Sequence, residues 1–302
     1  MSCTLITGGT GLIGSALCRY LTSLHQPVIV LSRRPETVAE KCGPTVTAVK
    51  SLDEISDDVH ITCVFNLAGA PIADRKWTSK RKQELYLSRV DLTKNLVYWL
   101  AHRQQKPECL ISGSAVGWYG DSGSTIVTEN SKPHDEFTHQ LCDAWEQQAK
   151  KAIALNIRVC IVRTGLVLAN NGGFLARLLP LFKLGLGGPS GDGQHYMPWV
   201  HINDLVHLLY TLSSNLNAHG IYNGCAPQPV TNLEFTKTLS QQLNRPALLP
   251  LPKWLLTFLL GEMAQLLLSG QNAVLERAKE IDFSFKYTQL DQALADLLPA
   301  KS

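Results

Sequence analysis

The first twenty-three residues constrain the fold more than any other part of the chain. Residues 3–7 (CTLIT) predict a short β-strand, residues 8–14 (GGTGLIG) a glycine-rich turn, and residues 15–23 a helix. This order of elements is typical of a dinucleotide-binding site. Gly8 permits the tight turn, Gly11 lets the backbone approach a pyrophosphate, and Gly14 lets the helix pack closely on the sheet. The free N–H groups and the dipole at the helix start favour a phosphate anion.

We therefore predict a nucleotide site, with a glycine turn that holds no ligand as the alternative. Its expected contacts are Gly8, Thr10, Gly11, Leu12, Ile13 and Gly14.

The second predicted strand indicates which nucleotide binds. Residues 27–31 (PVIVL) form an apolar run and are followed by Ser32, Arg33 and Arg34. An NAD-binding chain carries an acidic residue at about this place, for the ribose 2′-hydroxyl. Arginine instead binds phosphate through two parallel hydrogen bonds. We predict NADP(H) as the cofactor, with Ser32 and Arg33 at the 2′-phosphate. Two solvated arginines on a loop are the alternative.

Strands and helices alternate along the first half of the chain. Such alternation predicts an α/β fold of the Rossmann type, with a doubly wound parallel sheet and helices on both faces. Strands are expected at residues 5–6, 28–31, 45–49, 61–66, 109–112 and 158–163, and long helices at residues 83–102 and 139–155. Glycine clusters after residue 165 indicate a smaller, C-terminal substrate lobe. We expect a nucleotide-binding domain over residues 1–165 and this lobe over residues 166–302, with some later segments interleaved.

Three loops of small residues follow predicted strands. They cover residues 66–70, 112–114 and 164–165. Ligands of doubly wound sheets bind outside the carboxyl ends of the strands, so these loops belong on the cofactor side. Leu67, Ala68, Gly69 and Gly165 are the cofactor contacts expected from them.

Composition limits the partners. The 302 residues carry a formal charge of +3, with 18% charged and 45% hydrophobic residues. That charge is too small to favour nucleic acid or a membrane surface, and residues 254–269, the most apolar stretch, are too short to span a bilayer. The eight cysteines are scattered without CxxC spacing, which indicates thiols in a reducing compartment and no metal site. We expect a cytoplasmic protein with a small-molecule substrate, and consider a homodimer.

Several motifs carry a resemblance to a known family. They are residues 7–14 (TGGTGLIG), 66–69 (NLAG) and 199–205 (WVHINDL), joined by residues 184–189, 223–227 and 270–285. With these, essentially the whole chain resembles the extended short-chain dehydrogenase/reductase superfamily. More narrowly, it is similar to an atypical, NAD(P)-dependent epimerase-like branch that is named for a sugar-nucleotide epimerase and has its own C-terminal segment. The resemblance implies a Rossmann fold and a nicotinamide cofactor.

The same resemblance implies a catalytic Ser and a Tyr and Lys four residues apart. Ser114 stands where the Ser is expected. On the helix that carries Trp145, the Tyr position falls on Thr138 and the Lys position on Cys142, so that pair is absent. We predict Ser114 and Tyr119 as catalytic residues, with a packed aromatic as the alternative for Tyr119. Other proton donors left open are Cys142, His139, Tyr196 and His201, the last of which could instead brace the turn that follows it.

Glu84 and Arg89 lie on the helix after the loop of residues 66–70. The resemblance implies that the Ser88-Arg89 motif lies close to the cofactor. Arg89 is then expected to bind a cofactor phosphate or brace the adenosine side, and Glu84 to pair with Arg33 or bind a ribose or adenine edge. A salt bridge on a solvated helix face is the equal alternative.

Two functions follow from these residues. The first is an NADP(H)-dependent oxidoreductase or epimerase that acts on a small carbonyl or sugar-type substrate. The second is an NADPH-binding sensor, or a partner-binding protein without turnover, because the Tyr-x-x-x-Lys pair is absent. An open polar cleft near Ser114 favours the first function, and an apolar filling there favours the second.

Overall fold

The computed structural model describes residues 2–170 and 172–298. These residues build a seven-stranded sheet in the order β11-β7-β5-β4-β1-β2-β3, and all its strand pairs are parallel. The strands are β1 (Ser2–Thr7), β2 (Val28–Leu31), β3 (Thr47–Val49), β4 (His60–Asn66), β5 (Cys109–Ala115), β7 (Arg158–Thr164) and β11 (Gly220–Gly224). The order reverses direction between β1 and β4, as in a doubly wound sheet. The predicted fold class is confirmed.

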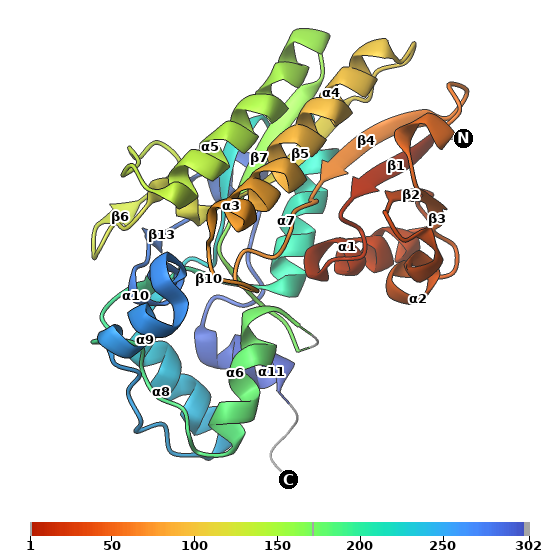
Figure 1. Cartoon of the computed structure of the whole chain (residues 1–302). Coiled ribbons are helices and arrows are strands. Elements are labelled where there is room, and N and C mark those ends of the chain that lie inside the picture. The colour runs from red at the N-terminus through yellow and green to blue at the C-terminus, as the bar shows by residue number, and fades with distance from the viewer. Residues whose placement is uncertain (1, 171, 299–302) are drawn as a thin grey trace.

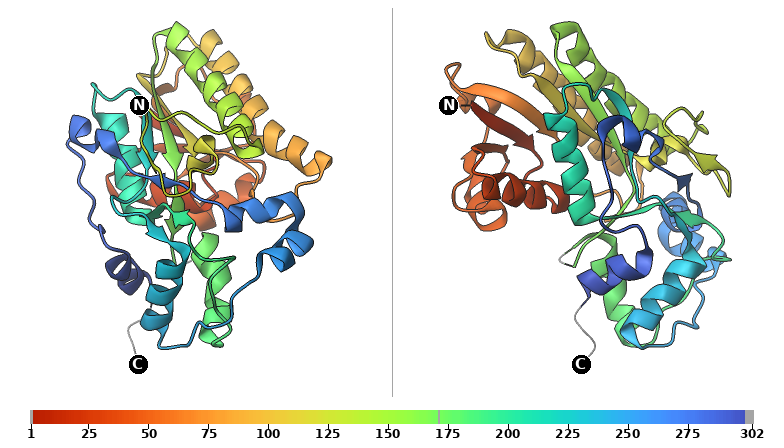
Figure 2. Two further views of the ribbon diagram at one scale, coloured as in Figure 1. Left: turned by 90° about the vertical axis from the view of Figure 1, so that its left-hand side faces the viewer. Right: turned by 180° about the vertical axis from the view of Figure 1, so that it is seen from behind.

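Helices cover both faces of this sheet because side chains alternate along each strand. Leu5 of β1 packs among side chains of α4 and α5, whereas its neighbour Ile6 packs among those of α1, α2 and α7. Figure 1 shows α4 and α5 side by side over one face, and the view from behind in Figure 2 shows α1 and α7 over the other. These helices are α1 (Leu12–Ser23), α2 (Val38–Cys42), α4 (Leu92–His102), α5 (Phe137–Lys150) and α7 (Ile202–Ser214).

The C-terminal half adds a smaller lobe beside the carboxyl ends of the strands (Figure 1). Its helices are α6 (Gly173–Lys183), α8 (Asn232–Leu243), α9 (Lys253–Leu260), α10 (Gln265–Leu268) and α11 (Leu290–Leu297). Three two-stranded pairs accompany it: β6 (Ile126–Val127) with β13 (Asn272–Ala273), β8 (Leu166–Leu168) with β10 (Trp199–His201), and β9 (Tyr196–Met197) with β12 (Val230–Thr231). Because α7 and β11 return to the sheet, the chain crosses between the two parts.

The helix expected over residues 83–102 is not continuous. It consists of α3 (Ser79–Tyr86), a π-helical turn over Leu87–Asp91, and α4. The apolar stretch after residue 253 is likewise divided, because α9 ends at Gly261, whose φ of +61° is left-handed. Hydrophobic periodicity predicts that a segment is helical, but it does not detect one inserted residue per turn.

Two features are missing from residues 2–170 and 172–298. None of their helices combines the length and the apolar character that a bilayer crossing requires. Within the same ranges, no cluster of three or more His, Cys, Asp or Glu side chains is arranged to hold a metal ion.

Candidate functional site

The glycine turn between β1 and α1 is bare in the sense that Gly8 and Gly14 have no room for a side chain. Gly8 has a φ of +73°, and an added Cβ would lie 2.7 Å from the backbone of Leu67 and Ala68. A Cβ on Gly14 would lie 2.3 Å from the Gly8 carbonyl oxygen. Gly11 precedes α1 without a side-chain cap, and its N–H donates to that same oxygen at 3.0 Å. The first N–H groups of a helix have no intrahelical acceptor, so this turn fits a phosphate.

A buried polar cluster fixes the loop that faces the glycine turn. Thr7 Oγ1 donates to Asn66 Oδ1 at 2.9 Å, and Asn66 Nδ2 donates to Thr93 Oγ1 at 2.7 Å and to Ser112 Oγ at 3.1 Å. Trp145 Nε1 also donates to Thr93 Oγ1, at 3.0 Å. The cluster joins β1, β4, β5, α4 and α5 at one end of the sheet. Fully bonded buried networks hold their members in one arrangement.

The end of β2 presents two free cations. Arg33 and Arg34 are exposed, and among the described residues neither forms an ion pair with a carboxylate. Ser32 Oγ accepts the Arg34 N–H at 3.1 Å, which shapes the loop. Solvent-facing guanidinium groups at this place leave their donors available to a phosphate.

Glu84 forms a salt bridge on its own helix, the alternative of equal weight, and does not pair with Arg33, while its contact with a ribose or adenine edge stays a prediction. The Glu84 carboxylate accepts Arg81 Nη1 at 2.7 Å, three residues back on α3, and stays exposed. That hydrogen bond, and then the charges of Arg75 and Arg33, lower the pKa of Glu84. Glu84 pairs with Arg81 because both side chains lie on the same face of α3, three residues apart. Arg33 affects the pKa of Glu84 only through its charge.

Ser114 lies at the carboxyl end of β5 and is bound to a buried ion pair. Its hydroxyl donates to Glu146 Oε1 at 2.7 Å. Arg163 of β7 donates to the same carboxylate through Nε at 2.8 Å and Nη2 at 2.9 Å, and its Cζ lies 3.4 Å from the centroid of the Trp118 ring. Glu146 and Arg163 are both buried. Because the Ser114 hydroxyl donates its one hydrogen bond to Glu146, its oxygen can only accept a hydrogen bond from a ligand.

Sequence reasoning missed this ion pair, although a signal was present. Glu146 follows Trp145 on the buried face of α5, and Arg163 directly follows the apolar run of residues 159–162 within the same buried strand. A charged residue at a position where the pattern demands an apolar one indicates a buried partner of opposite charge.

Tyr119 is not placed as an accessible proton donor. Its side chain is fully buried, and its hydroxyl donates to Asn223 Oδ1 at 2.8 Å. Burial raises its pKa to about 12. The packed-aromatic alternative therefore describes Tyr119, and the expectation that it supplies the proton does not fit this geometry.

The two positions of the absent Tyr and Lys carry no ready replacement. Burial, followed by the charge of Glu146, raises the pKa of Cys142 to about 11, so its thiol is protonated near neutrality. Thr138 is buried beneath Gly117. His139 Nδ1 bonds the Trp118 carbonyl oxygen at 2.7 Å.

His201 and Tyr196 are the remaining candidate proton donors. His201 Nδ1 accepts the Asn203 N–H at 3.1 Å, so His201 caps α7 and braces its turn as the alternative proposed. Tyr196 lies on β9, in the pair that β9 forms with β12.

The π-helical turn over Leu87–Asp91 contacts the loop of residues 67–70, which follows β4. The Ala68 N–H donates to Thr7 Oγ1 at 3.3 Å, and the Ala70 N–H donates to Ser88 Oγ at 3.0 Å. Arg89 lies directly under Gly69, since a Cβ there would come 2.8 Å from Arg89 Cζ. The structure thus brings the loop of Leu67–Gly69 together with the glycine turn and with Arg89.

Gly165 has a structural reason to be glycine. A Cβ there would lie 2.1 Å from the Pro198 carbonyl oxygen and 3.0 Å from Cys225 Sγ. Its backbone is pressed against the segment that leads into β10, so packing alone demands glycine at this position. A contact between Gly165 and a cofactor stays a prediction.

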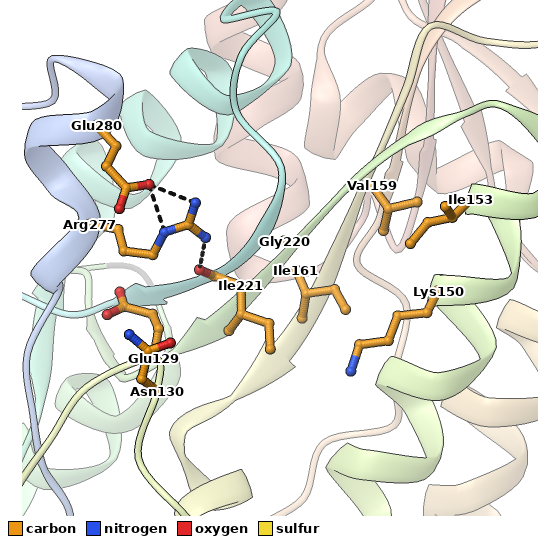
Figure 3. A pocket seen from close by; sticks show the side chains of 10 residues that line it. All are labelled: Glu129, Asn130, Lys150, Ile153, Val159, Ile161, Gly220, Ile221, Arg277 and Glu280. Carbon is orange, nitrogen blue, oxygen red and sulfur yellow. Dashed lines mark hydrogen bonds and ion pairs between the residues drawn. The ribbon is translucent and has the colours of Figure 1, made fainter.

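A cavity of about 420 Å³ lies elsewhere, against the amino-terminal parts of β7 and β11 (Figure 3). Its apolar floor includes Val159 and Ile161, and its charged groups are engaged: Arg277 pairs with Glu280 at 2.6 Å, and Glu129 accepts the Asn223 N–H at 2.9 Å. Because nucleotides bind at the carboxyl ends of such strands, this cavity is separate from the glycine turn.

A doubly wound parallel sheet, with a bare glycine turn where the strand order reverses, defines a Rossmann-type nucleotide-binding protein. Comparison with known proteins gives the family. The chain belongs to the NAD dependent epimerase/dehydratase family, whose model matches residues 4–224. A second model, a domain of unknown function (DUF1731), matches residues 251–297 and so covers α9 to α11. The resemblance noted from the motifs is confirmed.

Relatives match along nearly the whole chain. An epimerase family protein SDR39U1 homolog from Arabidopsis thaliana, named as chloroplastic, is 36% identical over 97% of this chain and 86% of its own length. The epimerase family protein YfhF of Bacillus subtilis is 34% identical over 97% of both chains. Among solved structures, human epimerase family protein SDR39U1 (isoform 2) with NADPH has a TM-score of 0.88 at 31% identity, covering 98% of this chain and 99% of the human one. A nucleoside-diphosphate sugar epimerase from Corynebacterium glutamicum has a TM-score of 0.75 at 30% identity, covering 98% and 58%.

Proposed function

We propose that the chain binds NADP(H) and is an oxidoreductase or epimerase acting on a small carbonyl or sugar-type substrate. The bare glycine turn, with free Arg33 and Arg34 beside it, is the observation that carries the proposal. The human relative solved with NADPH adds support. No acidic side chain stands at the end of β2 to favour the 2′-hydroxyl of NAD.

Each part of the site has a task in this function. The first N–H groups of α1 hold the pyrophosphate, and Ser32 and Arg33 hold the 2′-phosphate. When bound, the nicotinamide supplies hydride transfer. Ser114 orients a substrate oxygen, and because its own proton is directed to Glu146, it receives the hydrogen bond of a substrate hydroxyl.

Binding of NADPH without turnover is the second candidate function. The absent Tyr-x-x-x-Lys pair favours it, because Thr138 and Cys142 are both buried at those positions and Tyr119 is sealed away. Under either function we propose a small-molecule ligand and, from the eight buried free thiols, a cytoplasmic location. A homodimer is likewise a proposal.

Parallel titration with NADPH and NADH, followed by tryptophan fluorescence, tests the common part of both functions. We expect tight binding that favours NADPH. Arg33→Ala should weaken NADPH by about tenfold or more and leave NADH almost unchanged, because a charge-assisted phosphate contact is lost only from NADPH. Equal losses for both nucleotides would contradict the assignment of Arg33, and binding of neither would contradict the proposed function.

A further inference from the structure

The smaller lobe exposes large apolar side chains along one of its edges. Six of them, which we call the apolar patch, each expose half or more of their area. They are Leu184, Leu186, Leu248, Leu249, Trp254 and Phe258. Apolar side chains that gather on a surface in this way mark a contact with another protein or with a membrane.

The three segments that carry the apolar patch lie side by side. The chain after α6 is joined by hydrogen bonds to the chain between α8 and α9. The Leu249 N–H donates to the Gly187 carbonyl oxygen at 3.2 Å, and the Leu251 N–H donates to that of Pro189 at 2.8 Å. Helix α9 then begins at Lys253, and Figure 1 shows the chain between α8 and α9 along the outer edge of the lobe. The six side chains therefore occupy one stretch of surface.

Helix α9 is apolar on its outward side as well as on its inward side. Leu256 is buried, and Leu260 packs on the cluster that contains Trp77. Trp254 and Phe258 lie one helical turn apart and are 71% and 78% exposed. A helix on the surface of a protein needs only one apolar face to pack on its core. The outward face of α9 therefore indicates a second apolar contact.

The charges beside the apolar patch are all positive. Residues 178–191 and 235–261 contain no Asp or Glu. The exposed cations on the segments of the patch are Lys183, Arg245 and Lys253. Within the described part of the chain, none of the three forms an ion pair. The acids that border the two ranges each already accept a hydrogen bond; they are Asp192, Glu234 and Glu262. The net charge of +3 averages over the whole chain, whereas binding to a charged surface depends on the charge close to it.

We propose that the apolar patch docks the protein onto a lipid surface with anionic headgroups. Trp254, Phe258 and the leucines enter the boundary between headgroups and acyl chains, and the three cations bind headgroup phosphates. Aromatic and leucine side chains beside Lys and Arg are typical of elements that lie in this boundary. The inference goes beyond the proposed function and does not depend on it.

A second copy of this chain fits the apolar patch less well. In a two-fold dimer the same surface lies on both sides, so each cation comes close to identical cations with no carboxylate between them. A peptide partner needs a groove. Leu248 and Phe258 instead protrude, since they are 81% and 78% exposed. Protruding apolar side chains beside lysines suit a headgroup region, where a lysine stem stays in apolar surroundings and its ammonium reaches a phosphate.

Co-sedimentation with vesicles tests this proposal. We expect binding to vesicles of phosphatidylcholine that contain about one third phosphatidylglycerol, and binding at least about tenfold weaker to phosphatidylcholine alone. Replacing both Trp254 and Phe258 by Ser should weaken binding to the anionic vesicles by about tenfold or more, because their apolar area no longer leaves water. Replacing both Lys183 and Lys253 by Gln should have an effect of about the same size. Leu216→Ser is the matched control, because Leu216 is 74% exposed but lies outside the smaller lobe, and it should bind as wild type does.

Thermal unfolding checks the fold of each variant. The lysine variant keeps every apolar contact, so it tests the proposal even where the aromatic variant does not fold. A wild-type protein that stays in solution with anionic vesicles would overturn the inference, and so would binding that the lysine variant leaves unchanged. Sedimentation velocity without vesicles tests the second copy. A wild-type dimer that the aromatic variant dissociates would assign the apolar patch to self-association and overturn the lipid contact.

Discussion

At the scale of single residues, the site differs from what its motifs predict in how it holds Ser114. The hydroxyl that the resemblance assigns to substrate donates instead to Glu146, which Arg163 binds through two hydrogen bonds. The carboxylate therefore fixes the serine in one orientation. A buried ion pair of this kind contributes order at the site, while its desolvation offsets much of its electrostatic attraction.

Glu146→Gln tests how strongly this pair is needed. The change leaves the Arg163 guanidinium buried without its counter-charge, which costs about 3–5 kcal/mol of unfolding free energy. Urea unfolding followed by circular dichroism measures the loss. Lys150→Met is the control, because Lys150 Nζ lies 3.9 Å from Glu146 Oε2 and is partly solvated, so its loss costs less than about 1 kcal/mol. Equal losses in the two variants would contradict the role assigned to the buried pair.

Residue types and their spacing predicted the glycine turn, although only part of the reason for its glycines is local. The atoms that exclude a Cβ at Gly14 belong to Gly8 and Gly9, within the motif, whereas those that exclude a Cβ at Gly8 belong to Leu67 and Ala68 on the loop after β4. The burial of Tyr119 could not be predicted, because Asn223, which accepts its hydrogen bond, is 104 residues away in sequence, on β11. Contacts of that range depend on the whole topology.

At the scale of elements, the irregular segments carry the features that the sequence pattern did not reveal. Strands and long helices were predictable because apolar periodicity follows burial on the sheet. The sequence pattern predicts ordinary helix where the π-helical turn presents Ser88 and Arg89, because such a turn differs from an α-helix in its hydrogen bonds and not in its residue types. The break between α9 and the following turn shows a clearer signal, since Gly261 interrupts the apolar run.

Gly261→Ala tests whether that break is obligatory. Gly261 combines a φ of +61° with a ψ of −138°, a region that side chains other than glycine rarely occupy. No atom lies within 4 Å of an added Cβ, so any cost arises from backbone strain and not from a clash. We expect a loss of about 1–3 kcal/mol in unfolding free energy, measured by urea denaturation. Gln265→Ala, an exposed change on α10, should cost little, and a Gly261→Ala variant as stable as wild type would contradict the strain.

At the scale of the whole molecule, the segment before α11 is fastened to the start of α7 by a buried acid. Asp204 accepts the N–H groups of Lys286 and Tyr287, both at 2.9 Å. The Tyr287 ring stacks on His201, with centroids 3.9 Å apart, and His201 Nε2 lies 3.2 Å from Asp296 Oδ2 on α11. The family-specific C-terminal region is therefore tied to β10 and α7, and its attachment includes a titratable group.

This attachment should weaken in acid. Burial lowers the pKa of His201 below its ordinary value of 6.5. The charges of Asp296 and Asp204 raise this pKa but do not outweigh burial, and the charge of Lys286 lowers it further. A lowered pKa in the folded state means that the neutral imidazole is favoured there. Its contribution to stability is therefore complete above about pH 6.5 and is lost as the pH falls through the lowered value.

Urea midpoints at pH 8, 6.5 and 5.5, at constant ionic strength, measure this dependence. His201→Asn keeps an acceptor for the Asn203 N–H and removes the titration, so it should be less stable than wild type at pH 8 but lose less on acidification. His195, whose pKa burial also lowers, contributes separately, and His195→Asn gives its share. If the Asp296 charge instead dominated, wild type would gain stability relative to His201→Asn as the pH falls. That result would show that the C-terminal region is held by an ion pair and not by a neutral, stacked histidine.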